Sequence, residues 1–452
     1  MVGNDLTQGR VSKTLIRFTF PFFCGTFLHT LYSIVDMFIV GQYASAADMA
    51  AVSNGALIMY TVNTILTGYS TGATVFTGQI YGAKQEKNVR ETISTIFCFF
   101  PLLAILLLAL GLIFRHPLLG LLNTPAESYG AAEAYVRICM YGVFFTGFFC
   151  AIASVLRGMG DSTGPTIFVS VSCVLNVIGD YFTVKVLGWG AAGAALATTV
   201  SQGCSVLIGL IYLKKRKFPF DFRPKSFRIF RDKLIGLVRM GTPTACQELL
   251  SCISFWFIEA MINNLGYFAA AAAGVADRVF SLGNVLAQSF SAATAAMVAQ
   301  NIGAGRQERA HQSMRLSVVL CTAFGFVIML IMWAVPEKIV GLFTKDADVI
   351  TYGVQYLTFY KVDNILYAPA LCLIGYINGL GRTRYTMFIN LISALAVRLP
   401  LVWLITRIPG TTLREIGLSL PVASIAQLLL AGAFLLFWKG EREYRSGRKL
   451  RA

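Results

Sequence analysis

Carboxylates inside long apolar stretches are the residues of this sequence best suited to chemistry. Asp36 and Asp180 stand in two such stretches, and Asn176 precedes Asp180 by four residues, which places both on one face of a helix. An ionisable side chain in such surroundings is costly and is a functional candidate by default. Thr198 in the next stretch adds a hydroxyl. These four oxygen-bearing side chains suit a hard cation such as Na⁺, and the two carboxylates can alternatively trap a proton.

The depth of these residues supports a common site. At 1.5 Å per residue, Asp36, Asp180 and Thr198 lie about five, seven and eight residues from the same ends of their helices, within roughly 5 Å of one height. Each residue also has a simpler interpretation. Asp36 could extend to lipid headgroups, Asn176 could join two helices, and Thr198 could bond its own backbone. The agreement in depth favours the site.

The second half of the chain offers another acidic pair. Glu259 and Asp363 lie about six and eleven residues from the corresponding helix ends and could pair in the same way. They could instead form a structural ion network with Lys361 or Arg398. Both interpretations stay open.

The elements that position these residues are membrane helices. Of the 452 residues, 56% are hydrophobic and only 13% are charged, whereas about a quarter of a soluble protein is charged. Stretches of about 20 apolar residues can each cross a bilayer, and the sequence predicts an all-α polytopic protein with twelve of them. They cover residues 15–41, 50–78, 92–114, 131–156, 165–187, 190–213, 236–265, 270–300, 312–335, 352–380, 385–406 and 415–438.

The twelve stretches form two halves that repeat each other. The matching positions, 221 to 223 residues apart, are Gln79, Gly82 and Ala83 with Gln300, Gly303 and Ala304; Gly158 and Gly160 with Gly379 and Gly381; Pro21 with Pro243; and Asp36 with Glu259. Because six helices per half is an even number, we expect two six-helix lobes related by a pseudo-twofold axis along the membrane normal. We interpret the repeated glycines as turn and helix-end residues without chemistry of their own.

The repeat predicts four parts of the chain. They are an N-lobe over 1–213, a basic linker over 214–235 that opens with Lys214, Lys215, Arg216 and Lys217, a C-lobe over 236–438 and a basic tail over 439–452.

The net charge of +16 indicates topology rather than nucleic-acid binding. With both termini in the cytoplasm, inner segments hold about 28 Lys and Arg and outer loops about 6, as the positive-inside rule requires. We therefore expect a multi-pass protein of the cytoplasmic membrane whose basic segments contact anionic headgroups.

The chain resembles the multidrug and toxic compound extrusion (MATE) family over essentially its whole length. Asp36, Asn176, Asp180 and Thr198 match the N-lobe cation site of its DinF-type members, and Glu259 and Asp363 look like the C-lobe site of its NorM-type members. The resemblance implies an antiporter that exports organic, often cationic and aromatic compounds in exchange for Na⁺ or H⁺ by rocking-type alternating access. Pro21 is then a candidate hinge.

Two other functions fit this sequence less well. A flippase for lipid-linked precursors shares the architecture, but at least half of the intramembrane charges here are acidic, which argues against a polyanionic substrate. A membrane enzyme would need catalytic motifs, but HExxH and Walker A sequences do not occur, and the basic inner loops contain no DxxxD. We expect no enzymatic activity, no cofactor besides the coupling ion, and a monomer.

Overall fold

The computed structural model describes residues 4–122, 124–216 and 218–449, and within these the chain is built from helices without β-strands. Lys217 of the predicted linker and residues 450–452 of the predicted basic tail lie outside the described residues. The predicted all-α fold class is therefore confirmed.

The first half contains six long helical segments. Their bounds are α1 (Val11–Tyr43), α2 (Ala46–Gly82), α3 (Glu86–Leu121), α4 (Ala126–Gly158), α5 (Thr163–Asp180), continued by the π-helix η1 (Tyr181–Val186), and α6 (Gly190–Lys215). A 3₁₀ turn, η2 (Pro224–Ser226), lies in the linker.

The second half repeats this pattern with more interruptions. Its segments are α7 (Arg231–Asn263), α8 (Tyr267–Gly303), α9 (Gln307–Ala334), the short α10 (Pro336–Gly341), α11 (Ala347–Gly379), α12 (Thr383–Leu391), the π-helix η3 (Ile392–Arg398), α13 (Leu399–Ile405), α14 (Leu413–Gly417) and α15 (Ser419–Lys449).

Eleven helical segments of the described chain are long and apolar enough to cross a membrane. They correspond to eleven of the twelve predicted stretches. The remaining one, 352–380, is the 33-residue helix α11, which is long enough but carries Lys361, Asp363 and Asn364 in its middle. These polar residues lower its hydropathy below that of the other segments.

Several helices are longer than the predicted apolar stretches. The second stretch was expected over 50–78, and α2 runs from Ala46 to Gly82. Ser45 caps its start by accepting a hydrogen bond from the Asp48 backbone N–H, while the Asp48 carboxylate accepts one from the Ser45 backbone N–H. This capping box satisfies backbone groups that the helix cannot pair itself, so the helix extends beyond its apolar part.

The chain divides into two compact units. Unit 1 contains residues 1–249, 295–311 and 379–383, and unit 2 contains 250–294, 312–378 and 384–452. Within unit 1, the start of α7 packs along α2. There the Thr244 hydroxyl donates to the Gly68 carbonyl at 2.7 Å.

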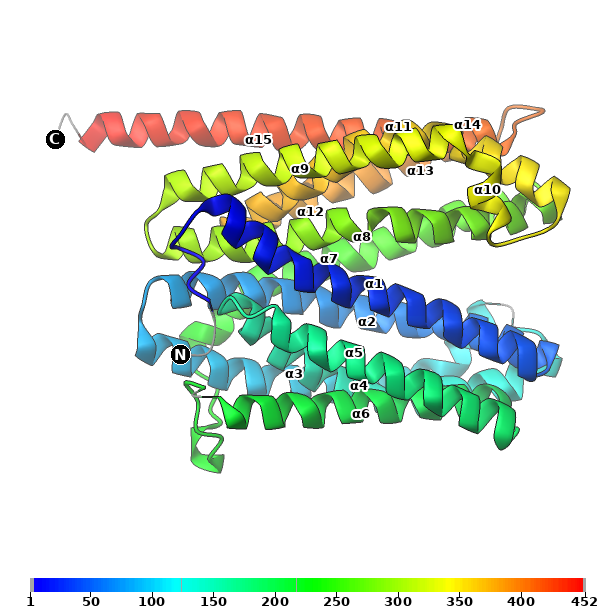
Figure 1. Ribbon diagram of the computed structural model, residues 1–452, viewed down its shortest axis with the longest axis horizontal. Helices are drawn as coiled ribbons and strands as arrows, with labels where there is room; N and C mark the ends of the chain where they lie inside the picture. Colours follow the sequence, from blue (N-terminus) through cyan, green and yellow to red (C-terminus); the bar gives the residue numbers. More distant parts are fainter. Residues whose placement is uncertain (1–3, 123, 217, 450–452) are drawn as a thin grey trace. The chain divides into compact units, whose positions relative to one another are not determined.

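The core of unit 1 lies between α2, α3, α4 and α6, which pack against one another and run lengthwise in Figure 1. Glycines allow the close approach of large side chains. Tyr135 on α4, for example, lies directly against Gly55 on α2, where a methyl group would overlap its ring. Helix α5 packs on both α1 and α6, which places the helices of the predicted N-lobe site next to one another.

Unit 2 has a separate core. It is formed by buried apolar residues of α7, α8, α9, α10, α11, α13 and α14, among them Tyr356, Leu357 and Tyr360 on α11. Helix α9 approaches α11 closely at Gly325, where a methyl group would overlap the Asn364 carbonyl.

Candidate ion-binding site

The four predicted N-lobe residues come from three adjacent helices of unit 1. Asp36 lies on α1, Asn176 and Asp180 on α5, and Thr198 on α6. The side chains of Asn176 and Asp180 are 1% and 0% exposed, whereas Asp36 and Thr198 are half-buried. The α5 side of the site is therefore fully buried, whereas the side chains from α1 and α6 are partly exposed.

A hydrogen bond joins two of the predicted ligands. The Asn176 amide Nδ2 donates to the Thr198 hydroxyl at 3.2 Å. The helices come close here because α5 has a glycine at this level: a methyl group on Gly179 would lie 2.9 Å from Cβ of Ala197. The glycine thus permits the helix spacing that lets Thr198 reach Asn176.

The two carboxylates complete the set. Asp36 and Asp180 interact electrostatically with each other. Within the described chain, Oδ1 of Asp36, Oδ1 of Asn176 and both carboxylate oxygens of Asp180 are buried and have no hydrogen-bond partner. Buried oxygen acceptors are normally paired, so four unpaired acceptors in one place suit a cation or a proton.

The backbone changes at this position. Helix α5 ends at Asp180 and continues as the π-helix η1 from Tyr181. Such π-helical turns inside a helix are rare and often occur at functional sites. The change of helical pitch alters the direction of the side chains that follow Asp180.

Other side chains around the carboxylates were not assigned to the site from the sequence. Tyr32 on α1 and Cys139 on α4 lie near both Asp36 and Asp180, and Tyr135 on α4 lies near Asp36. Tyr32 precedes Asp36 by four residues, so helical spacing could have identified it. Tyr135 and Cys139 could not be found this way, because only the packing of α4 brings them to the site.

The second-half residues are arranged differently from the predicted pair. Glu259 on α7 interacts with Asp277 on α8. Asp363 on α11 is 4% exposed, hydrogen-bonds the Ser424 side chain and interacts with Arg398. Arg398 also interacts electrostatically with Asp277. Glu259 and Asp277 form a second pair of carboxylates, and Oδ1 of Asp363 is buried without a hydrogen-bond partner among the described residues. Arg398 supplies positive charge to both Asp277 and Asp363.

The candidate hinge has a lateral contact. Pro21 lies inside α1, and its ring removes a backbone hydrogen bond from that helix. The Thr166 hydroxyl on α5 donates to the Pro21 carbonyl at 2.6 Å. Next to it, the Arg157 guanidinium of α4 lies 4.6 Å from the ring centroid of Phe22. Helix α1 is therefore held by α4 and α5 at its weakest point.

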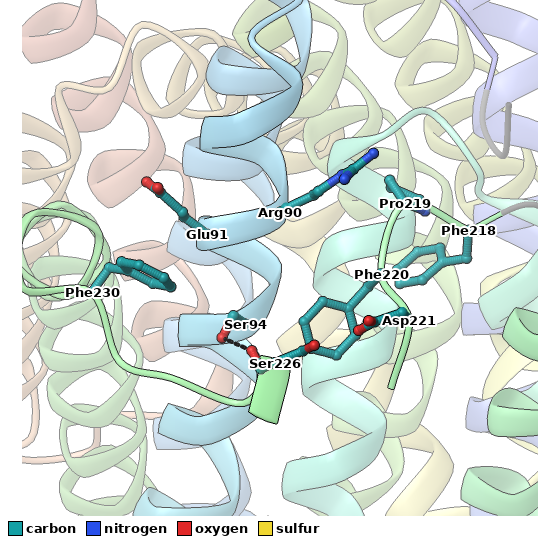
Figure 2. A pocket seen from close by; sticks show the side chains of 9 residues that line it. All are labelled: Arg90, Glu91, Ser94, Phe218, Pro219, Phe220, Asp221, Ser226 and Phe230. Carbon is teal, nitrogen blue, oxygen red and sulfur yellow. Dashed lines mark hydrogen bonds between the residues drawn. The ribbon is translucent and has the colours of Figure 1, made fainter. Parts of the chain in front are cut away.

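A pocket of about 390 Å³ lies away from these carboxylates, where the linker folds back on the start of α3 (Figure 2). It is lined by Arg90, Glu91, Ser94, Phe218, Pro219, Phe220, Asp221, Ser226 and Phe230. The Ser94 hydroxyl donates to the Ser226 carbonyl at 2.7 Å and accepts from the Arg228 backbone N–H at 2.7 Å. Because its charges have both signs and its hydrogen bonds hold the linker, we interpret it as a structural feature.

Comparisons with known proteins place these features in a family. The probable multidrug resistance protein YoeA of Bacillus subtilis is 26% identical over 97% of this chain and 96% of its own length. A FAD transporter of Shewanella oneidensis is 24% identical over 93% of this chain and 94% of its own length. The crystal structure of a mutant of the Vibrio cholerae MATE transporter VcmN has a TM-score of 0.87 at 21% identity, covering 94% of this chain and 97% of that one.

The family model MatE matches the chain twice, over residues 21–182 and 243–404. The two matches begin at Pro21 and Pro243, which are the positions that the internal repeat had paired. The chain therefore belongs to the MatE family of multidrug efflux transporters.

Proposed function

We propose that this transporter is a secondary active antiporter that exports organic cations in exchange for Na⁺ or H⁺. The observation that carries the proposal is the pair Asp36 and Asp180, two interacting carboxylates on neighbouring helices with unpaired buried oxygens. Two like charges at such a site are costly unless a cation or a proton joins them. Binding of the ion therefore changes the stability of this helix cluster.

The amide and hydroxyl groups select between the two ions. A Na⁺ ion would use the free Oδ1 of Asn176 and the hydroxyl oxygen of Thr198 besides the carboxylates, because hard cations take several oxygen ligands. A proton would need only the carboxylates. Either ion would drive export with the same two contributions. The membrane potential supplies about 2.3 kcal/mol per charge for each 100 mV, and the concentration gradient of the ion supplies the rest.

Coupling to the substrate is proposed to pass through α1. Asp36 lies on this helix, and Pro21 interrupts its hydrogen bonding 15 positions earlier. When the ion draws Asp36 and Asp180 together, α1 moves relative to α5, and the Thr166–Pro21 contact is where the helix adjusts. Substrate and ion then bind in alternation as the chain switches between two open states.

Glu259 and Asp363 remain the rival coupling site. Arg398 offsets the negative charge of Asp277 and Asp363, whereas the interactions of Asp36 and Asp180 include no basic group among the described residues. This favours the first-half set. We further propose that both termini lie in the cytoplasm, that the protein acts in the cytoplasmic membrane, and that it is a monomer.

Purified protein in liposomes tests the proposal. Efflux of ethidium is followed while a sodium gradient and a pH gradient are imposed separately, with FAD as a second substrate because one relative is named for it. We expect one gradient to drive ethidium export. Asp36→Asn should abolish gradient-driven export while the protein stays folded, as judged by its Tm.

Glu259→Gln serves as the matched control on the second-half set, and it should retain coupled export. Failure of wild type to respond to either gradient contradicts antiport. Normal export by Asp36→Asn with loss in Glu259→Gln would assign coupling to the second half instead.

A further inference from the structure

We propose that Gln79 and Gln300 are positioning residues that fasten the two repeats to each other at one end of the helices. Their hydrogen bonds must then break whenever the transporter opens at that end. The inference rests on the proposed alternating access. Both glutamines belong to the repeated motif. From the sequence, we interpret only the glycines of this motif, as turn and helix-end residues.

The two glutamines bond crosswise. The Gln79 amide Nε2, in the first repeat, donates to the carbonyl of Gly379 in the second repeat at 3.0 Å. The Gln300 amide Nε2, in the second repeat, donates to the carbonyl of Gly158 in the first repeat at 2.8 Å. Because the four residues occupy equivalent positions of the repeat, one contact is made twice. All four lie in unit 1.

The accepting carbonyls are suited to this contact. Gly158 and Gly379 are the last residues of α4 and α11. Carbonyls in the last turn of a helix have no partner within the helix and carry the negative end of its dipole. A side chain that donates an N–H therefore fills a need that the helix itself leaves open.

The backbones meet next to these bonds. A methyl group on Gly82 would overlap the Gln300 carbonyl, and one on Gly303 would overlap the Gln79 carbonyl. Glycine is needed at both positions because only a residue without Cβ allows the helix ends to approach this closely. The repeated glycines thus end helices, as expected, and also form the contact.

Unit 1 shows where this fastening lies. The residues of 295–311 and 379–383 that it includes come from the end of α8, the start of α9, the end of α11 and the start of α12. These segments carry the second copies of the motif. In the proposed topology this is the cytoplasmic end.

The N-terminal segment strengthens one half of the pair. Gln300 Oε1 accepts from the Leu6 backbone N–H at 3.1 Å, so both ends of its amide are bonded. The Asn301 amide donates to the Leu6 carbonyl at 3.3 Å. Arg309 donates to the Gln8 and Gly9 carbonyls, each at 2.6 Å. Gln300 is 0% exposed while Gln79 is half-buried, so Gln79 is the accessible half for mutation.

Amide hydrogen exchange on the purified wild-type protein and its variants tests the fastening without substrate or ion. The reporters are the amides just beyond the helix ends, which bond within their own turns: Ala83, Gly160, Ala304 and Gly305. Removing one hydrogen bond by Gln79→Ala should raise their exchange about fivefold to tenfold. Gln312→Ala, at an exposed glutamine on α9, is the matched control and should exchange as wild type.

Gln79→Glu separates hydrogen bonding from space filling. A carboxylate has nearly the same size as an amide but only accepts hydrogen bonds. At neutral pH the reporter amides of Gln79→Glu should therefore exchange at least as fast as those of Gln79→Ala. Wild-type exchange in Gln79→Glu would show that the side chain merely fills space and would overturn the proposal. Equal exchange in wild type and Gln79→Ala would also overturn it.

Transport supplies an independent arm. Weakening the fastening favours the state open at this end, so Gln79→Ala should lower the maximal efflux rate while keeping its response to the driving gradient. If wild-type protein shows no response to any gradient, the proposed function fails, and the exchange result still decides the fastening. The Tm of Gln79→Ala and Gln79→Glu confirms that both variants fold.

Discussion

The amide nitrogen of Asn176 on α5 donates a hydrogen bond to the hydroxyl of Thr198 on α6, with 3.2 Å between the two atoms. The bond fixes the orientation of the Asn176 amide, because its nitrogen faces α6 and its oxygen Oδ1 is left unpaired. The lone pairs of Thr198 and Asn176 are thereby available next to Asp180, four residues along α5. A bond between two helices thus orients the oxygen atoms of the proposed ion site.

Removing the Thr198 hydroxyl should weaken ion binding. Thr198→Val keeps the shape of the side chain but deletes one oxygen and leaves the Asn176 N–H without its partner. We expect the ion concentration for half-maximal ethidium efflux to rise about tenfold, the effect of one lost polar contact of about 1.4 kcal/mol. Thr71→Val is the control, since that hydroxyl bonds the Thr67 carbonyl of its own helix. If a sodium gradient drives efflux and Thr198→Val leaves the ion dependence unchanged, Thr198 is not a ligand of the site. If only the pH gradient drives efflux, an unchanged ion dependence indicates that the coupling ion is a proton.

The spacing of α5 and α6 should matter as much as the ligands. Gly179→Ala places a methyl group 2.9 Å from Cβ of Ala197, so the helices must separate. Overpacking of this kind costs about 1–3 kcal/mol, and we expect both a lower Tm and weaker ion dependence of efflux.

The reciprocal substitution provides the control for this prediction. Ala197→Gly restores the space, so the double variant should recover much of the wild-type Tm and ion dependence. Gly203→Ala, where the nearest atoms of Phe145 are 3.7 Å from the new methyl group, should change neither. Lack of recovery in the double variant would mean that the helix spacing is not what positions Thr198.

The stability of the N-terminal segment should depend on pH only in the acidic range. Burial acts to raise the pKa of Asp5, but hydrogen bonds from Thr7 and Gln8 prevail and hold it below 3.8. A lowered pKa means that the stabilisation is present above the unfolded value and is lost as pH falls through the folded value. Exchange of the amides of residues 6–9, corrected for intrinsic rates, should therefore show constant protection from pH 5 to 8.

Asp5→Asn should reduce this protection at every pH in that range. The change should be small, about twofold, because the carboxylate is largely exposed to solvent. Protection that disappears in wild type between pH 5 and 6 would contradict the assignment and point to another titrating group.

The two acidic sets show how far depth can be used to infer a site. Counting residues placed Asp36, Asp180 and Thr198 at one height, and the structure connects them through Asn176 and through the two carboxylates. The same counting allowed Glu259 to pair with Asp363. The structure gives Glu259 the neighbour Asp277 and gives Asp363 the neighbours Ser424 and Arg398. Height along a helix does not say which neighbouring helix a side chain faces.

The glycine motifs show the same limit. The sequence predicted correctly that Gly82, Gly158, Gly303 and Gly379 end helices, since α2, α4, α8 and α11 finish there. Nothing in a single repeat indicates that the Gln79 and Gln300 amides reach into the opposite repeat.

The sequence by itself determined the membrane class, the helices and the doubled organisation. Apolar length and helical period are local properties that each segment carries alone. The tertiary structure decided which polar groups meet: Asn176 with Thr198, Glu259 with Asp277, and the two glutamines with opposite helix ends. These contacts depend on how each helix is rotated and how closely it packs, and that is set by many residues together, including glycines such as Gly179 whose effect is felt only across a helix interface.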